Sequence, residues 1–344
     1  MALLLPLSAP SDEVDISMIS VTYGNVPRTH CARNVLTLFN VLEKELAWRR
    51  QAGKPEGYHV LQTSLPIVAL GAEHPLEGED LAADYFCGED GLQNVYKAYP
   101  HFSPAKDWPK LFEDAGDVAV ETVDATAGFT PSKHPAHHEM LRFLRENPEN
   151  SIIIVAMGPF TGLRPYLAQH GFNHVISTHP IIKPSQVSSH PSAQSYFEQQ
   201  IKPHVEAGSH LALWTSFFIM ATFDQITSLQ VTEKEPELSL HDPLTIWYAM
   251  TRDQGVWEST AKPEDLRVET TGEWTRGMHV VDKRNRKIAD DGSTPTGVSS
   301  EAADNILGDD MGWLNPNKGN RINRLVKSPG VDVFREHWIQ RVFG

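Results

Sequence analysis

Residues 151–163, SIIIVAMGPFTGL, decide the fold class of this chain. After Ser151, the residues up to Ala156 are all apolar and mostly β-branched, so both faces are apolar, which is typical of a central strand in a parallel sheet. This strand meets Gly158-Pro159, and a short helix is expected over 162–169. A strand that turns directly into a helix is the repeating unit of an α/β protein.

The same alternation of strand and helix continues on both sides of this stretch. It indicates a mostly parallel central sheet flanked by helices, within a single domain spanning 1–344. Irregular loops are expected over 171–195 and 290–317, which are rich in polar residues, Gly and Pro. Further strands are predicted over 16–22, 66–70, 266–270, 278–282 and 324–327, and helices over 31–50, 137–147, 196–206, 211–229, from 242, and over 331–342.

Composition narrows the classes of partner. Acidic residues outnumber basic ones 44 to 30, for a net charge of −14. A surface this acidic argues against binding nucleic acid through its phosphates. The only cysteines are Cys31 and Cys87, which suits a reducing, cytoplasmic setting better than a disulfide scaffold. No apolar run approaches the ~18 residues of a membrane span, and the opening MALLLPLSAP resembles the end of a helix rather than a signal peptide.

Three strand or helix ends carry candidate binding or catalytic residues. Ligands of open parallel sheets bind where the strands end. Asn25 follows Gly24 at the end of the first predicted strand, where a turn is the simpler explanation. Met157 ends the strand at 151–156, and its carbonyl could serve as a ligand for a hard cation or simply lie in a strand–turn–helix junction.

The third such end is His241-Asp242-Pro243 at the start of a predicted helix. Asp before Pro is a good helix N-cap, so capping is one explanation of Asp242. The other is a carboxylate ligand for Ca²⁺, with the neighbouring His241 as a proton donor, since histidine as a residue type can protonate a leaving group at physiological pH. The residues alone leave both open.

A zinc site is a weaker alternative. His134 and His138 are four residues apart in HPAHHE, at a spacing that two zinc ligands on one helix share. Pro135 lies between them and interrupts the helix that this pairing needs. No third ligand is evident.

Taken together and in order, several stretches resemble the calcium-dependent nucleoside hydrolases, the inosine–uridine-preferring family. The resemblance covers roughly 1–170 and 195–344. The HDP element is fairly specific, and the co-linear set is more so. The matching stretches are ISVTYGNV (19–26), PIVALGAEHPL (66–76), DYFCGEDGL (84–92), SIIIVAMGPFTGL (151–163), LHDPLTIWYAM (240–250) and RVETTGEWTRGMHVVDKRN (267–285).

This resemblance implies a protein that hydrolyses the N-glycosidic bond of ribonucleosides and uses Ca²⁺ at the strand ends. It implies that His241 protonates the departing base and that Asp242 and the Met157 carbonyl bind the metal. Asn25 would line the ribose pocket. The partner would be a small nucleoside. Members of the family commonly form dimers or tetramers, so the resemblance also allows a homo-oligomer.

The sequence departs from the family pattern in two places. The family's opening strand and D-x-D-P-G-x-D-D motif do not occur in it, and residues 167–195 do not match the family's central ribose-binding block. Cys87 also stands where the family usually has His. Ca²⁺ takes 6–8 oxygen ligands, so we expect weak calcium binding and little or no hydrolysis. A missed first exon would give the same pattern. The alternative is a non-catalytic protein that retains the scaffold for binding or assembly.

Overall fold

A computed structural model describes most of the chain. The described residues are 1–75, 86–113, 128–158, 175–177, 193–230, 236, 238, 240–260, 263–269, 272–275, 278–282, 309–313, 315, 318–319 and 321–344. They fall into two compact units. The first comprises 1–180, 184–253 and 330–344, and the second comprises 181–183 and 254–329.

The first unit contains two short parallel sheets. Strand β1 (Met18–Val21) pairs with β2 (Ile67–Leu70), and β2 pairs with β3 (Thr130–Pro131), all in parallel. Strand β4 (Ile154–Ala156) pairs in parallel with β5 (Val175–Ser177). The helices that join them make the unit an α/β structure, which confirms the predicted fold class.

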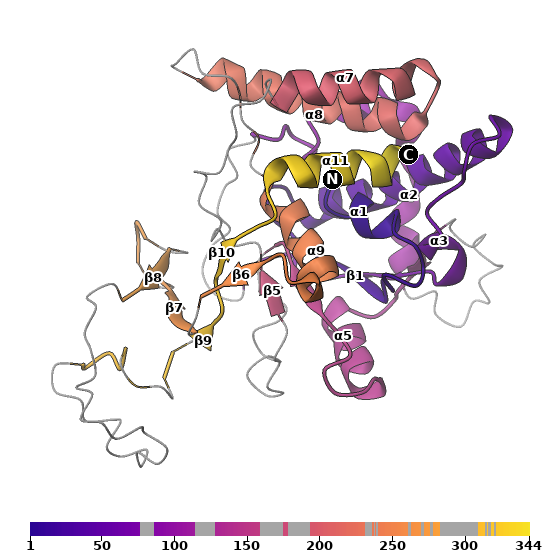
Figure 1. The fold of residues 1–344 in the computed structure, drawn as a ribbon. Coiled ribbons are helices and arrows are strands. Elements are labelled where there is room, and N and C mark those ends of the chain that lie inside the picture. The colour runs from indigo at the N-terminus through magenta and orange to yellow at the C-terminus, as the bar shows by residue number, and fades with distance from the viewer. Residues whose placement is uncertain are drawn as a thin grey trace, which may run out of the picture. The chain divides into compact units, whose positions relative to one another are not determined.

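Helices supply most of the core of this unit, and α7 and α8 lie side by side in Figure 1. Apolar residues of α2 and α8, such as Phe39, Leu42, Leu211 and Ile219, are almost fully buried. The helices are α1 (Leu4–Leu7), α2 (Arg28–Gln51), α3 (Val60–Thr63), α4 (Val95–Ala98), α5 (Ala136–Glu146), α7 (Ala193–Glu206), α8 (His210–Leu229), α9 (His241–Thr251) and α11 (Val331–Phe343), with short 3-10 turns at Pro100–Phe102, Trp108–Phe112 and Arg252–Gln254.

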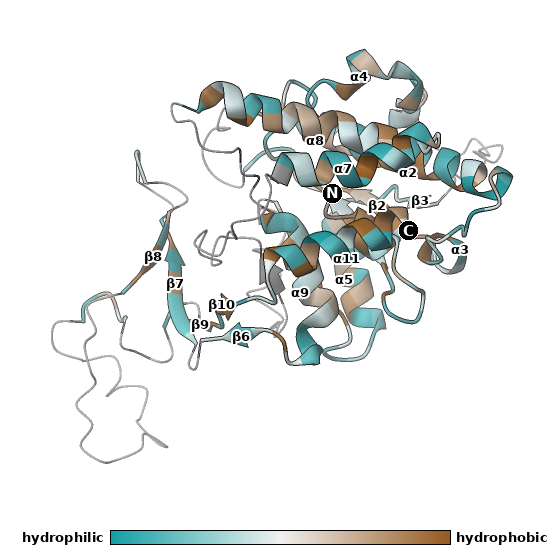
Figure 2. Cartoon of the chain, turned by 45° about the horizontal axis from the view of Figure 1, so that its top comes forward, coloured by the Kyte–Doolittle hydropathy of each residue, from teal (hydrophilic) through white to brown (hydrophobic). Residues whose placement is uncertain are grey.

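The second unit is antiparallel among its described residues. Strand β6 (Glu258–Ser259) pairs with β10 (Leu325–Lys327), and β7 (Glu264–Val268) pairs with β8 (His279–Val281) and β9 (Arg321–Ile322). Strand β7 is largely hydrophilic, as its colour in Figure 2 shows. Its charges are paired, since Arg324 lies 2.7 Å from Glu264 and Arg267 lies 2.8 Å from Asp265.

Most predicted elements are found within a few residues of their expected bounds, and one expectation was wrong. Residues 175–177 form β5, although 171–195 was expected to be irregular, because pairing with β4 orders that segment. Strand β4 was expected to be central; among the described residues it pairs with β5, and its central position stays a prediction. The helix expected over 162–169 and nearly all of 290–317 lie outside the described residues.

One buried ion pair joins three helices of the first unit. On α2, Arg49 Nε donates to Glu45 Oε1 at 2.9 Å, and the two side chains are 4% and 1% exposed. Glu45 Oε2 also accepts from Ser209 Oγ at 2.7 Å, at the start of α8. Arg49 Nη2 donates to the Val342 carbonyl of α11 at 3.0 Å. Each charge therefore has several hydrogen-bond partners, which is what allows an ion pair to be buried.

Arg49→Met is expected to lower the free energy of unfolding by about 3–5 kcal/mol, because it leaves the Glu45 carboxylate buried without its partner. Urea denaturation of the full chain, followed by circular dichroism, measures this change. The double variant Glu45→Met, Arg49→Met should recover much of the loss, since no charge then remains buried.

Arg50→Met is the matched control. Arg50 is the next residue on the same helix and lies 3.4 Å from Glu56, with side chains 57% and 36% exposed. Exposed pairs contribute only about 0–1 kcal/mol. If Arg49→Met cost no more than Arg50→Met, the buried pair would not hold these helices together.

Candidate active site

The carboxyl ends of β1, β2 and β4 lie close together. Thr22 follows β1, Gly71 follows β2 and Gly158 comes two residues after β4. A Cβ added at Gly71 would lie 2.7 Å from Thr22 Cγ2, and one at Gly158 would lie 3.2 Å from Thr22 Oγ1. The absence of a side chain at Gly71 therefore permits this close approach. Ligands of parallel sheets bind at such an edge.

The loop after β1 carries Asn25. The Tyr23 amide donates to the Ala72 carbonyl at 3.1 Å, and the Gly24 amide donates to the Val26 carbonyl at 3.1 Å. The first bond holds the loop against the segment that follows β2, and the second lies within the loop. Arg28 secures the same place, because its Nη1 donates to the Gly71 carbonyl at 2.8 Å. Asn25 itself is exposed on the tip of the loop.

A second loop, 86–94, packs against the Asn25 loop. The sequence did not predict this contact. A Cβ at Gly91 would lie 3.0 Å from Val26, and Asn34 Nδ2 of α2 donates to the Asp90 carbonyl at 2.9 Å. The Asp90 carboxylate accepts from the amides of Leu92 and Asn94 at 2.8 and 2.7 Å. The signal in the sequence was an Asp between two glycines, a common turn composition.

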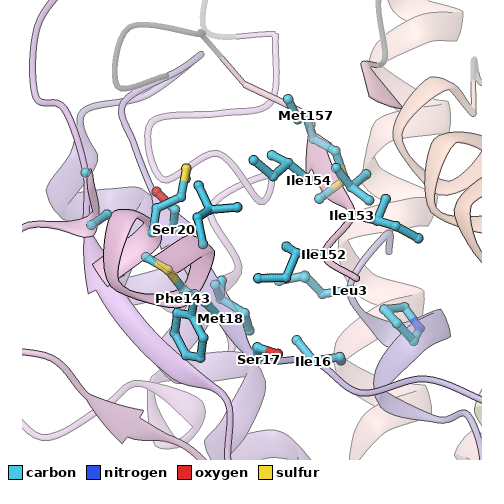
Figure 3. Close-up of a pocket in the computed structure, with 18 of the residues that line it drawn as sticks. Leu3, Ile16, Ser17, Met18, Ser20, Phe143, Ile152, Ile153, Ile154 and Met157 are labelled. Carbon is cyan, nitrogen blue, oxygen red and sulfur yellow. The ribbon is translucent and has the colours of Figure 1, made fainter. Parts of the chain in front are cut away.

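Met157 follows β4 and is half-buried. It lines a cavity of about 1270 Å³ in the first unit, together with Thr22 and Gly158. Figure 3 places Met157 at one end of this cavity. The predicted strand end is therefore where the sequence indicated.

His241 and Asp242 are the first two residues of α9, and both are exposed. Leu240 occupies the N-cap position and makes no side-chain capping bond. Asp242 is therefore the second residue of the helix and not its N-cap. The capping explanation of this residue was wrong. An acidic residue in the first turn still interacts favourably with the helix dipole.

Burial by neighbouring protein raises the pKa of Asp242 above its ordinary value, even though the residue as a whole remains exposed. The Met1 amino group and His241 partly oppose this shift. Burial likewise lowers the pKa of the Met1 amino group to about 6, against the attraction of Asp242. Asp242 and the Met1 amino group therefore lie close enough to influence one another's ionisation.

Of the four predicted site residues, the structure places only Met157 on the wall of the cavity. Helix α9 packs against β4, and Ile246 and Met250 of α9 line the cavity with Met157. His241, Asp242 and Asn25 are not among the lining residues. Their shared role in one site stays a prediction.

The described residues do not fit a complete calcium site. Among them, no group of three or more His, Cys, Asp or Glu side chains lies close enough to hold a metal ion. Asp242 and the Met157 carbonyl would leave most of the 6–8 oxygens to water. The structure does not support the zinc alternative either. Pro135 is the N-cap of α5 and His134 lies outside that helix, so His134 and His138 are not two ligands on one helix.

Comparison with known proteins places these features in a family. Residues 1–171 match the model of the inosine-uridine preferring nucleoside hydrolases. The chain belongs to the nucleoside hydrolase family. No curated protein sequence matches it, and among its described residues no helix is long and apolar enough to cross a membrane.

Solved nucleoside hydrolases have the same fold. A plant nucleoside hydrolase, PpNRh1, is similar with a TM-score of 0.60 and 16% identity, over 100% of this chain and 94% of its own. An inosine-guanosine nucleoside hydrolase is similar with a TM-score of 0.58 and 14% identity, over 99% of this chain and 94% of its own. An inosine-uridine preferring nucleoside hydrolase from Bacillus anthracis is similar with a TM-score of 0.51 and 12% identity, over 99% of this chain and 93% of its own. At these identities, the similarity establishes the fold alone.

Asp242→Asn is expected to leave the melting temperature at pH 7 unchanged or higher. A carboxyl group whose pKa is raised on folding destabilises the fold once pH rises above its ordinary value, near 3.8, and the cost persists at neutral pH. The amide removes that cost. The melting temperature of the variant relative to the unmodified chain should therefore increase between pH 3 and pH 7 in calorimetry.

Asp253→Asn is the control, because Asp253 lies just beyond the other end of α9 with its side chain 89% exposed. It should shift the melting temperature little at any pH. A lower stability of Asp242→Asn at pH 7 than at pH 3, relative to the unmodified chain, would mean that the ionised carboxylate stabilises the fold.

Proposed function

We propose that this protein hydrolyses the N-glycosidic bond of ribonucleosides, releasing the base and ribose. The observation that carries the proposal is His241-Asp242 at the start of α9, a helix that packs against β4, the strand that Met157 follows. Membership of the nucleoside hydrolase family supports it. We also propose a cytoplasmic setting, which the scarcity of cysteine supports.

In this proposal His241 acts on the leaving group. Cleavage of the bond between the anomeric carbon and the base leaves an electron pair on the base nitrogen. A proton from the His241 imidazolium goes to that nitrogen as the charge develops, and water adds its hydroxyl to the ribose carbon. The proton that the water gives up passes to solvent, from which the imidazole is protonated again, so the reaction balances as nucleoside plus water giving base and ribose. Histidine suits this step because its ordinary pKa lies near neutral pH.

The remaining predicted residues would bind rather than transfer protons. Asn25, on the exposed loop after β1, would donate and accept hydrogen bonds with ribose hydroxyls. Asp242 and the Met157 carbonyl would offer oxygens to a cation such as Ca²⁺. Because these two groups make up only a small part of a calcium shell, we expect calcium to bind weakly.

That shortage favours a second candidate function, which is nucleoside binding without turnover. Metal-activated water needs a firmly held ion, and one carboxylate and one carbonyl supply little of its shell. A non-catalytic protein would keep the fold and the strand-end loops, and would bind the nucleoside through Asn25. Turnover measurements with binding measurements distinguish the two functions.

The test is release of base from inosine and uridine by the full chain, with millimolar CaCl₂ and with EDTA. His241→Ala is expected to lower kcat by roughly 100-fold, the usual contribution of general acid catalysis, with KM within a few-fold. His138→Ala is the control, because His138 is exposed on α5. It should leave kcat unchanged.

Three results would each contradict a part of this proposal. Saturable nucleoside binding by calorimetry without any release of base would favour the binding function. Turnover that His241→Ala leaves intact would mean that another group protonates the base. Activity lost on His138→Ala and restored by zinc would support the zinc alternative instead.

A further inference from the structure

A chain of hydrogen bonds runs from the buried side of α2 to the loop 86–94. The Thr37 hydroxyl donates to the Tyr96 hydroxyl at 3.1 Å, and the Tyr96 hydroxyl donates to Asn34 Oδ1. Asn34 Nδ2 in turn donates to the Asp90 carbonyl at 2.9 Å. Thr37, Tyr96 and Asp90 are all buried. Linked bonds in such surroundings polarise and strengthen one another, so this chain is a firm anchor for the loop.

The Asn34 side chain has to accept and donate at once. Its Oδ1 accepts from Tyr96 while its Nδ2 donates to Asp90. A carboxylate has no hydrogen to give the Asp90 carbonyl, and an apolar side chain would leave both partners unpaired. Burial raises the pKa of the Tyr96 phenol well above its ordinary value, although the hydrogen bond from Thr37 opposes this shift. The phenol therefore keeps the proton that it donates.

The loop 86–94 needs an anchor because part of its backbone is strained. Gln93 and Asn94 have φ angles of 58° and 61°, in the left-handed region that residues other than glycine adopt infrequently. The Asp90 carboxylate supports this conformation by accepting from the amides of Leu92 and Asn94. Strained backbone persists only where the surrounding contacts impose it, and it is concentrated at ligand-binding segments.

The anchored loop also supports the turn that carries Asn25. Gly91 approaches Val26 so closely that an added Cβ would lie 3.0 Å from the Val26 Cγ2 atom. The Val26 carbonyl accepts from the Gly24 amide at 3.1 Å, and this bond closes the turn around Asn25. A loop released at Asp90 would therefore withdraw the packing behind Val26 and loosen the turn.

We propose that Asn34 is a positioning residue for nucleoside binding, because it fixes the loop 86–94 against the turn that carries Asn25. Asn34 touches no ligand in this role. It acts through the backbone of the loop and through Val26 on the position of the Asn25 amide. This inference rests on the proposed function, in which Asn25 binds the ribose hydroxyls.

Calorimetry of inosine binding to the full chain tests this role. Asn34→Asp keeps the size of the side chain and the acceptor for Tyr96, but it cannot donate to the Asp90 carbonyl. It is expected to weaken inosine binding roughly tenfold, which is what one lost hydrogen bond can cost. In turnover measurements KM should rise by the same factor and kcat should change less than about threefold, because Asn34 takes no part in the bond cleavage.

A double-mutant cycle shows whether Asn34 acts through Asn25. In an Asn25→Ala background, Asn34→Asp should weaken inosine binding by less than about twofold, because the amide that it positions is no longer present. Losses that add in full would mean that Asn34 supports only the general stability of the fold, and the proposal would then be wrong.

Hydrogen exchange tests the coupling of the two segments without any nucleoside. Asn34→Asp should speed the exchange of amides in both 88–94 and 23–26 by roughly tenfold, whereas Asn40→Ala should change neither. Asn40 is the matched control, because it lies on the same helix and is partly exposed. Tyr96→Phe removes the donor to Asn34 and replaces Asn34→Asp in these tests if that variant does not fold. Circular dichroism checks each variant.

The outcomes separate this inference from the proposed function. Faster exchange in 88–94 alone, or in neither segment, would overturn the inference, since the loop and the turn would then move independently. Inosine binding of undiminished affinity in Asn34→Asp would also overturn it and leave the proposed function intact. A lack of inosine binding by the unmodified chain would refute the proposed function, and exchange would then decide by itself whether Asn34 couples the two segments.

Discussion

The buried pair of Glu45 and Arg49 is the interaction on which the helical part of the first unit depends. Through it, α2 reaches the start of α8 at Ser209 and the end of α11 at Val342. Ser209 in turn caps α8 by accepting from the Ala212 amide at 3.0 Å. A charge pair this deep is tolerated because further hydrogen bonds satisfy both partners, and it therefore specifies where the three helices meet.

The sheet obeys a different constraint. A parallel strand has two edges, and its backbone groups require partners on both of them when they are away from water. Strands β1 and β4 have such partners on one side each among the described residues. The hollow between them explains why an Ile-rich segment is only partly buried. The same hollow reaches Met157 and Gly158, which follow β4.

The position of the candidate site depends on the helices and on the parallel strands described above. The two parallel sheets bring Thr22, Gly71 and Gly158 together, and the loop carrying Asn25 is held by hydrogen bonds to the segment after β2. Helix α9 packs on β4 and carries His241 and Asp242 at its first turn. Membership of the nucleoside hydrolase family motivates the proposed chemistry, while among the described residues no group of three or more His, Cys, Asp or Glu side chains could hold a cation.

The sequence by itself determined the fold class, the family and most of the elements, because these depend on local patterns. Apolar runs at 16–22, 66–70 and 151–156 predict strands, and the spacing in 31–50 and 211–229 predicts helices. Only the tertiary structure decided that Arg49 joins three helices, that loop 86–94 packs on the Asn25 loop, and that β4 pairs with β5. Those outcomes depend on residues far apart in the chain meeting in space, and no local pattern of hydrophobicity specifies which partners will meet.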